Sequence, residues 1–198
     1  MPDKTVRCLS PLMRRALELD RTSASAKSSC DRIMSRLLKI EPLTREAFAP
    51  FGTIIEADPA TMRHINGGNT ERFHGLARAD VVGDGANVII NIFRGQPRSF
   101  PYSVTMMERH PLGSQSFSPL DDRPWLVVVA DDEDGRPGTP RVFQANGRQG
   151  VNYGRNIWHH PLMSVGAVSD FLIVDREGPG NNLEEFFYDE PFVIESAI

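Results

Sequence analysis

The sequence predicts a mainly all-β domain, a sandwich or a barrel, that occupies residues 37–198. Seven short segments there are rich in the β-branched and aromatic residues that favour strands. Turn signals rich in Gly, Pro, Asp and Asn, such as DDEDGRPGTP and NGRQG, separate these segments. Many short strands with turns between them are typical of sandwiches and barrels. The predicted strands are 86–93, 102–108, 114–120, 124–130, 141–145, 149–153 and 170–175.

One short helix is expected before these strands, within the segment LTREAFAPFG. Thr44 is a suitable N-cap, and Glu46 places a negative charge in the first turn. Pro50 and Gly52 then end the helix. After it, no stretch has a convincing apolar period of 3.6 residues, so the strands carry the fold.

The N-terminal segment differs in composition from the rest of the chain. Residues 1–39 contain nine Lys/Arg and four Asp/Glu, whereas residues 40–198 contain thirteen arginines, no lysine and twenty-two acidic residues. The segment is rich in Ser, Ala and Arg and poor in large apolar residues, so we expect residues 1–36 to form a disordered basic tail. The alternatives are an organelle transit peptide, or a translation start assigned too early, with Met34 as the true start.

Composition also excludes several kinds of chemistry and partner. The net charge is −4 and no apolar run approaches the length of a membrane span, so we expect neither a nucleic-acid partner nor a membrane. Both cysteines, Cys8 and Cys30, lie in the N-terminal segment, so residues 40–198 offer neither a lysine Schiff base nor a thiolate. This suits a reducing compartment, and we expect a cytoplasmic protein. The chain has no P-loop, G-x-G-x-x-G, H-E-x-x-H or G-x-S-x-G motif.

The segment ERHPLGSQSF places polar groups where a strand ends. Alternate side chains of a strand share one face, so Tyr102, Val104, Met106, Glu108 and His110 are expected on one side unless a bulge intervenes. If that side is the barrel interior, a carboxylate and an imidazole enter one cavity together. Gln115 follows across the turn on the next predicted strand. A surface turn with a charged rim is the alternative.

Two further segments concentrate histidines. In YGRNIWHHP, strand alternation points one of His159 and His160 inward and the other outward, near Tyr153 and Arg155. A buried histidine with one hydrogen bond is the alternative to a functional group there. In HINGGNTERFH, Gly67 and Gly68 permit a close approach to a ligand, although an ordinary flexible loop explains the composition as well.

Six segments, in chain order, resemble the bacterial ureidoglycolate lyase family, also called the ureidoglycolate hydrolases. They are EPLTREAFAPFGTIIE, HINGGNTERFH, MERHPLGSQSFSPL, VVVA, GVNYGRNIWHHPL and DFLIVDR. The resemblance extends from about residue 38 to about residue 185 and does not include residues 1–36. It implies a cupin-type double-stranded β-helix, or jelly-roll barrel, with one or two short helices, usually as a homodimer.

The resemblance also implies candidate metal ligands. In cupin terms, His110 and Gln115 stand where the first motif carries its His and Glu, and His159 stands where the second motif carries its His. A divalent metal on these three residues is implied only if the protein binds one, and nickel is the leading candidate. The chain departs from the metal-binding pattern, because Gln115 replaces a Glu and Glu108 replaces the first His. Gly154 stands where many relatives have a His.

The implied reaction cleaves (S)-ureidoglycolate to glyoxylate and urea, a step in allantoin and purine nitrogen catabolism. It needs a base for the hydroxyl proton, an acid for the leaving nitrogen, and a cation for the carboxylate. We assign His110 or His159 as the base and Glu108 as its partner or as the acid. The carboxylate clamp is Arg72, with Arg109 and Arg155 as weaker candidates. The remaining residues expected to bind the substrate are His64, Asn66 and Gln115, and Tyr153 is expected as a further catalytic residue that orients the hydroxyl or urea group.

Two other functions stay open from the sequence. A ureidoglycolate amidohydrolase would release ammonia and would require an activated water, usually on a metal. A non-catalytic cupin would bind a small carboxylate without turnover. The nitrogen-containing product separates the first alternative from the lyase, and glyoxylate binding without turnover identifies the second. A metal-dependent isomerase or dioxygenase fits less well, because the ligand set is incomplete.

Overall fold

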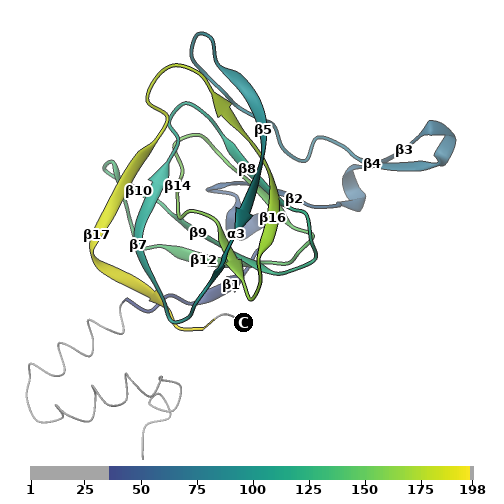
Figure 1. Ribbon diagram of the computed structural model, residues 1–198. Helices are drawn as coiled ribbons and strands as arrows, with labels where there is room; N and C mark the ends of the chain where they lie inside the picture. The colour runs from purple at the N-terminus through teal and green to yellow at the C-terminus, as the bar shows by residue number, and fades with distance from the viewer. Residues whose placement is uncertain (1–35, 197–198) are drawn as a thin grey trace, which may run out of the picture.

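The computed structural model describes residues 36–196, and these are mostly strands. The predicted tail, with Cys8, Cys30 and Met34, lies outside the described residues except for Arg36. Two curved, mainly antiparallel sheets face each other and form one barrel (Figure 1). The predicted all-β, cupin-like fold is therefore confirmed. Within the described residues, no helix is long and apolar enough to cross a membrane.

The larger sheet has eight strands, six of which follow one another in the order β1-β12-β9-β14-β7-β17. The short strand β15 pairs with β9 and β6, and β1 is parallel to β12. The bounds are β1 Ile40–Pro42, β6 Pro97–Arg98, β7 Tyr102–Arg109, β9 Trp125–Ala130, β12 Arg141–Ala145, β14 Trp158–His159, β15 Met163–Val165 and β17 Glu184–Ile194.

The second sheet has five strands in the order β2-β13-β8-β16-β5, so β5 is an edge strand. Its strands are β2 Gly52–Ile55, β5 Asn87–Gly95, β8 Gln115–Pro119, β13 Gly150–Tyr153 and β16 Ser169–Glu177. Two small hairpins complete the strands, formed by β3 Met62–Ile65 with β4 Thr70–Phe73 and by β10 Asp132–Glu133 with β11 Arg136–Pro137. The helical segments are α3 Arg45–Phe48, η2 Pro59–Thr61 and η3 Asn66–Gly68.

The main core fills the space between the two sheets. Strand β9 contributes Val127 and Val129 to it, while β16 contributes Phe171 and Ile173. Leu126, Val128 and Ala130 of β9 belong to a second core on the opposite face. The continuous apolar run WLVVVA is explained by this arrangement, because a strand buried on both faces has no polar alternation.

Seven strands and the helix lie where the sequence predicts them. Thr44 accepts a hydrogen bond from the Ala47 backbone nitrogen at 3.2 Å and so caps α3 as expected. The sequence did not predict β17, whose residues EEFFYDEPFVI mix acidic and aromatic side chains around Pro191. It also did not predict the hairpin of β3 and β4, where a loop was the expectation.

The predicted alternation along β7 breaks once. Val104 and Met107 are both buried in the second core, although strict alternation would place them on opposite faces. The pairing of β7 with β17 shifts register between Phe187 and Phe192, which produces the irregularity. Glu108 lies beyond it and faces the barrel interior, so the predicted orientation holds for Glu108 but not for Val104.

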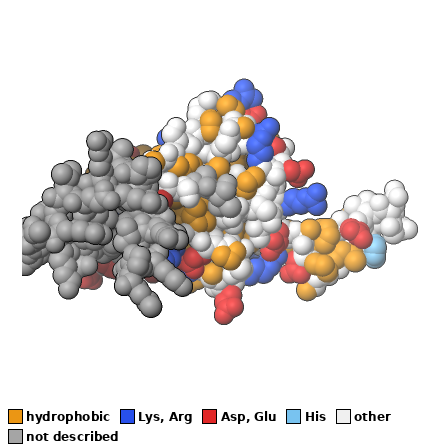
Figure 2. Space-filling model, turned by 90° about the horizontal axis from the view of Figure 1, so that it is seen from below, with side chains coloured by type: hydrophobic (Ala, Val, Ile, Leu, Met, Phe, Trp, Pro, Cys, Tyr) orange, Lys and Arg blue, Asp and Glu red, His pale blue; other side chains and the backbone are white. Residues whose placement is uncertain are grey.

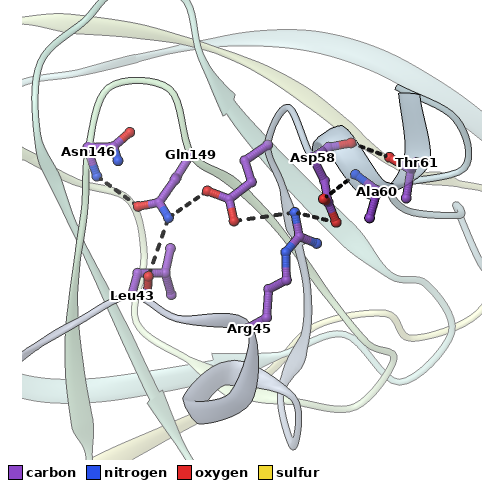
Figure 3. A network of polar contacts seen from close by, with 8 residues as sticks. Leu43, Arg45, Asp58, Ala60, Thr61, Asn146 and Gln149 are labelled. Atoms are coloured by element: carbon purple, nitrogen blue, oxygen red, sulfur yellow. Dashed lines mark hydrogen bonds and ion pairs between the residues drawn. The ribbon is translucent and has the colours of Figure 1, made fainter. Parts of the chain in front are cut away.

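The hairpin of residues 62–73, here called the hairpin arm, extends away from the barrel (Figure 1). A polar network fixes the segment that leads into it (Figure 3). Arg45 pairs with Glu56 at 3.3 Å and with Asp58 at 3.7 Å, and Asp58 accepts from the Ala60 nitrogen at 2.9 Å. Gln149 donates to Glu56 at 2.8 Å. The arm therefore leaves the body in a defined direction.

Candidate active site

Three polar side chains meet inside the barrel near the end of β7. Glu108 lies directly opposite His159 of β14 in the strand pairing, and His159 Nε2 is 3.6 Å from Glu108 Oε1. His110 follows β7 by one residue, and its ring centroid is 5.2 Å from that of His159. One ligand atom from each residue lies within 4.8 Å of those of the other two. We call Glu108, His110 and His159 the polar trio.

Backbone carbonyls fix the tautomer of both imidazoles in the trio. His159 Nδ1 lies 2.8 Å from the Ile157 oxygen, and His110 Nδ1 lies 2.7 Å from the Asn182 oxygen. A carbonyl oxygen only accepts, so each Nδ1 carries the proton and donates it. Each Nε2 is then left with its lone pair. Both Nε2 atoms are buried and have no hydrogen-bond partner in the described part of the chain.

Burial shifts the charge states of the trio. Burial, together with the nearby His110, lowers the pKa of His159 to about 3. His159 is therefore neutral at pH 7. Burial also raises the pKa of Glu108, and Glu185 adds to this effect, while His110 opposes it. Glu108 thus keeps its proton to a higher pH than an exposed glutamate.

Tyr153 and His160 complete the surroundings of His159. The Tyr153 ring stacks on the His159 ring with centroids 4.4 Å apart and an interplanar angle of 13°. Burial raises the pKa of Tyr153, so this phenol stays protonated. His160 lies on the opposite face of the strand, where Nδ1 donates to the Pro161 oxygen at 2.7 Å and Tyr102 Oη is 3.1 Å from Nε2. The two histidines point to opposite faces as predicted, but His160 is buried rather than exposed.

A cavity of about 270 Å³ opens beside the trio. His110 borders both the trio and the cavity. The other residues that line the cavity are Ser114, Gln115, Asp175, Arg176, Asn181, Asn182 and Leu183. Pockets of this scale hold small molecules, and the polar lining suits a small polar metabolite. Gln115 Oε1 is buried without a hydrogen-bond partner, so it is a free acceptor at this cavity.

The sequence analysis missed Asp175, which lines the cavity at the end of β16. Burial raises the pKa of Asp175, while hydrogen bonds from Gln115 and Asn91 lower it. Strand alternation contained the signal, because Phe171 and Ile173 face the core and Asp175 continues the same face. Asn182 was also missed. It anchors His110 through its backbone oxygen and accepts from the Leu112 nitrogen at 2.8 Å.

Two predicted substrate-binding arginines are held elsewhere by carboxylates. Arg109 pairs with Glu184 at 2.6 Å and Asp132 at 2.8 Å, and its guanidinium lies 4.3 Å from the Trp158 ring centroid. It is on the face of β7 opposite to Glu108. Arg155 Nε donates to Asp80 at 2.8 Å. Neither side chain lines the cavity of its own chain.

Of the other four predicted substrate-binding residues, Gln115 lines the cavity, and the hairpin arm carries His64, Asn66 and Arg72. All three are exposed, and none lines the cavity of its own chain. The structure therefore does not bring them to the trio within one chain. Sequence spacing gave no indication of this, because the direction of a hairpin depends on what fixes its base.

The donor set of the trio fits a divalent metal ion. Two imidazole nitrogens and a carboxylate oxygen suit ions such as Ni²⁺ or Zn²⁺. In metal sites the second nitrogen of a ligating histidine commonly donates to a carbonyl, as both Nδ1 atoms do here. The sequence predicted His110, Gln115 and His159 as ligands. The group that converges contains Glu108 with the two histidines, and Gln115 lies beside His110 along the cavity.

Comparisons with known proteins agree on one family. The family model described as ureidoglycolate lyase matches residues 35–195. The chain is 83% identical over 161 residues to ureidoglycolate lyase 1 of Rhizobium meliloti (strain 1021), covering 81% of this chain and 95% of the relative. It is 72% identical over 161 residues to ureidoglycolate lyase of Rhizobium etli (strain CIAT 652), covering 81% and 97%. For the protein of that name from Agrobacterium fabrum (strain C58 / ATCC 33970) the identity is 66% over 161 residues, with the same coverage of 81% and 97%.

Proposed function

Because the chain belongs to the ureidoglycolate lyase family, we propose that it cleaves (S)-ureidoglycolate to glyoxylate and urea. The observation that carries the proposal is the polar trio. It offers two imidazole nitrogens without a hydrogen-bond partner in the described residues and a carboxyl group with a raised pKa, all beside a small cavity. A lyase that moves protons needs this combination of groups.

The reaction requires two proton movements at one carbon. The hydroxyl group loses its proton, its oxygen becomes the carbonyl of glyoxylate, and the carbon–nitrogen bond breaks. The nitrogen of the departing urea takes up a proton. Atoms and electrons balance without an oxidant, a reductant or a covalent enzyme intermediate. General acid and base groups accelerate such steps by roughly 10²–10⁴-fold each.

The geometry favours His110 as the base. His110 borders the cavity, and its Nε2 lone pair is free because Nδ1 donates to Asn182. His159 is more deeply buried and its pKa is lowered to about 3, which makes it a weak base. We assign it instead to holding Glu108 in position. Glu108 keeps its proton to a higher pH than usual and is the proposed acid for the urea nitrogen.

Gln115 is proposed to orient the urea group. Its buried Oε1 lacks a partner in the described residues and can accept an N–H bond from urea. The proposed Tyr153 role is to hold the His159 ring by stacking. A divalent ion, when bound, would be held by the lone pairs of the trio and would polarise a substrate oxygen as a Lewis acid, so the base and acid roles of His110 and Glu108 apply to the ion-free protein. Ni²⁺ is the first ion to test.

The test is product identification with the purified chain. The protein is treated with a chelator, divided, and assayed with and without added Ni²⁺ for glyoxylate, urea and ammonium from ureidoglycolate. Equal amounts of glyoxylate and urea support the lyase. Ammonium in place of urea indicates the amidohydrolase, and glyoxylate binding without turnover indicates a binding protein. Fractionation of cells tests the cytoplasmic location, which remains a prediction.

A further inference from the structure

The inner face of the second sheet carries a row of polar side chains beside the cavity. Tyr153 of β13 pairs directly with Gln115 of β8, and directly opposed residues of two strands share one face. Gln115 is hydrogen-bonded to Asp175 of β16. On the edge strand β5, Asn91 Nδ2 donates to Asp175 Oδ1 at 3.2 Å. We call Asn91, Asp175, Gln115 and Tyr153 the polar row.

Asp175 determines which way the amide of Gln115 points. A carboxylate oxygen only accepts hydrogen bonds, so the amide nitrogens of Asn91 and Gln115 are the donors. Burial raises the pKa of Asp175, and the bond from Gln115 opposes this, as a bond donated to the charged form does. The oxygen of Gln115 is therefore turned away from Asp175. This Oε1 is buried and has no hydrogen-bond partner among the described residues.

The orientation of this amide decides what a ligand meets. An amide oxygen accepts hydrogen bonds and an amide NH2 group donates them, although the two groups are similar in size. Packing alone therefore does not choose between them, whereas the charge of Asp175 does. In a cavity of about 270 Å³ a small ligand contacts few groups, so one acceptor in place of a donor changes which ligand fits.

The urea half of ureidoglycolate matches this acceptor better than the carboxylate half does. The nitrogens of urea carry N–H donors, whereas a carboxylate only accepts and is repelled by Asp175. The barrel adds no free cation here, because Arg176 is the one arginine among the described residues that lines the cavity, and its guanidinium donates to three backbone oxygens. The hairpin arm stands clear of the body of its own chain (Figure 2). The polar row therefore suits a neutral group with donors.

We propose that Asp175 is a positioning residue that makes the site specific for a leaving group with N–H donors. It acts through Gln115, whose oxygen it directs to the ligand, while Asn91 holds the Asp175 carboxylate in place. The inference rests on the proposed function, since it assigns the urea group of ureidoglycolate as the ligand of Gln115. It adds the residue that selects this group.

Asp175→Asn should reverse the amide of Gln115. Asn91 donates to the oxygen at position 175, so the oxygen of the introduced amide stays on Asn91 and its NH2 group faces Gln115. Gln115 must then accept with Oε1 and turn its own NH2 group toward the ligand. The donors of Gln115 and of urea would then face each other. The affinity for urea should fall by about 10–100-fold, because a buried donor is left without an acceptor.

Binding of the two products measures this effect without turnover. Each isotope-labelled, chelator-treated protein is titrated with urea and, separately, with glyoxylate, and Kd is taken from the NMR shifts of the backbone amides of residues 112–116. In Asp175→Asn the Kd for urea should rise, whereas the Kd for glyoxylate should not, because a nearby negative charge is removed. A merely structural role would weaken the binding of both products. Retained glyoxylate binding also shows that the variant is folded.

A second substitution should restore the acceptor. In Asp175→Asn/Gln115→Glu, the introduced NH2 group donates to one carboxylate oxygen at position 115, and the other oxygen is left to accept from urea. The Kd for urea should return to within about threefold of the wild-type value. Urea is neutral, so the carboxylate moved to position 115 does not repel it.

Asp170→Asn is the matched control. It makes the same chemical change on the same strand, β16, at an ion pair with Arg94 that does not line the cavity. Both dissociation constants should equal those of the wild type. In the lyase assay, Asp175→Asn should raise KM by about 10–100-fold with a smaller effect on kcat, whereas the control changes neither.

Several results would overturn the positioning role of Asp175. They are an unchanged Kd for urea in Asp175→Asn, an equal loss of affinity for urea and glyoxylate, a double variant as weak as the single one, and a wild type that binds no urea. The proposed function fails separately. A wild type that binds urea, with variants that discriminate as expected, but that forms no glyoxylate and urea from ureidoglycolate, would keep the role of Asp175 and refute the lyase.

Discussion

Glu108→Gln is expected to separate activity from stability. The amide keeps the size of the side chain but cannot donate a proton as an acid, so kcat should fall by about 10²–10⁴-fold. This corresponds to about 3–5 kcal/mol of lost transition-state stabilisation at 1.36 kcal/mol per factor of ten. The loss follows from the placement of Glu108, 3.6 Å from His159 and beside His110.

The same variant should unfold at a higher temperature in the metal-free protein. Burial raises the pKa of Glu108 in the folded state, so the native protein binds this proton more tightly than the unfolded chain. Stability is then lost as the pH rises from the unfolded pKa through the folded one. The amide removes this loss, and its N–H can donate to the bare Nε2 of His159. One such bond contributes about 1 kcal/mol, or about 2–4 °C in Tm for a domain of this size.

The assay combines kinetics with calorimetry on chelator-treated protein. Initial rates of urea release give kcat, and thermal scans at pH 7 and pH 4 give Tm for both proteins. The gain in Tm should be present at pH 7 and should shrink at pH 4, where the glutamate carries its proton in both states. A variant that is active and less stable at pH 7 would refute both the acid role of Glu108 and the interpretation of its burial.

Three further changes test other parts of the structure. Gln115→Glu adds a carboxylate beside His110 and should tighten Ni²⁺ binding by at least about tenfold in calorimetric titration; unchanged affinity would separate Gln115 from the ligand set. Phe143→Ala removes a fully buried ring that packs on Phe48 and Phe51, and should cost about 3–5 kcal/mol in urea unfolding. A cost below 1 kcal/mol would contradict its place in the main core. Thr44→Ala removes the cap of α3 and should cost about 0.5–1 kcal/mol in the same assay, against an unchanged exposed-site control, Arg148→Ala.

The positions of the strands, and the face on which Glu108 and His110 lie, were predictable because both depend on local patterns. Turn residues mark where strands end, and the pleat places Glu108 and His110 on one side. Asp175 was predictable by the same rule and was missed, because the segment was treated as a buried apolar strand. The prediction that Glu108 faces inward could have been wrong, since the alternation of β7 is interrupted before this residue. Local patterns therefore place a residue on a face only between irregularities.

The direct pairing of His159 with Glu108 was beyond local prediction. It depends on strand β14, which has two residues and is held between β9 and β7. The positions of Arg109 and Arg155 away from the cavity were not predictable for a related reason. Composition counts arginines but does not say which carboxylates neutralise them, and Asp132 and Asp80 are each more than twenty residues away in sequence from the arginine they bind.

The hairpin arm shows both reasons why sequence patterns fall short: they give neither the direction of an element nor the partners of its side chains. Its residues His64, Asn66 and Arg72 suggest a binding site by type, yet in one chain they contact no cavity. A binding site at the arm would need a second surface to complete it. One apolar surface that the fold of a single chain leaves exposed is formed by Val88, Ile90 and Ile92. Covering those side chains with another surface would contribute about 25 cal/mol for each Å² removed from water.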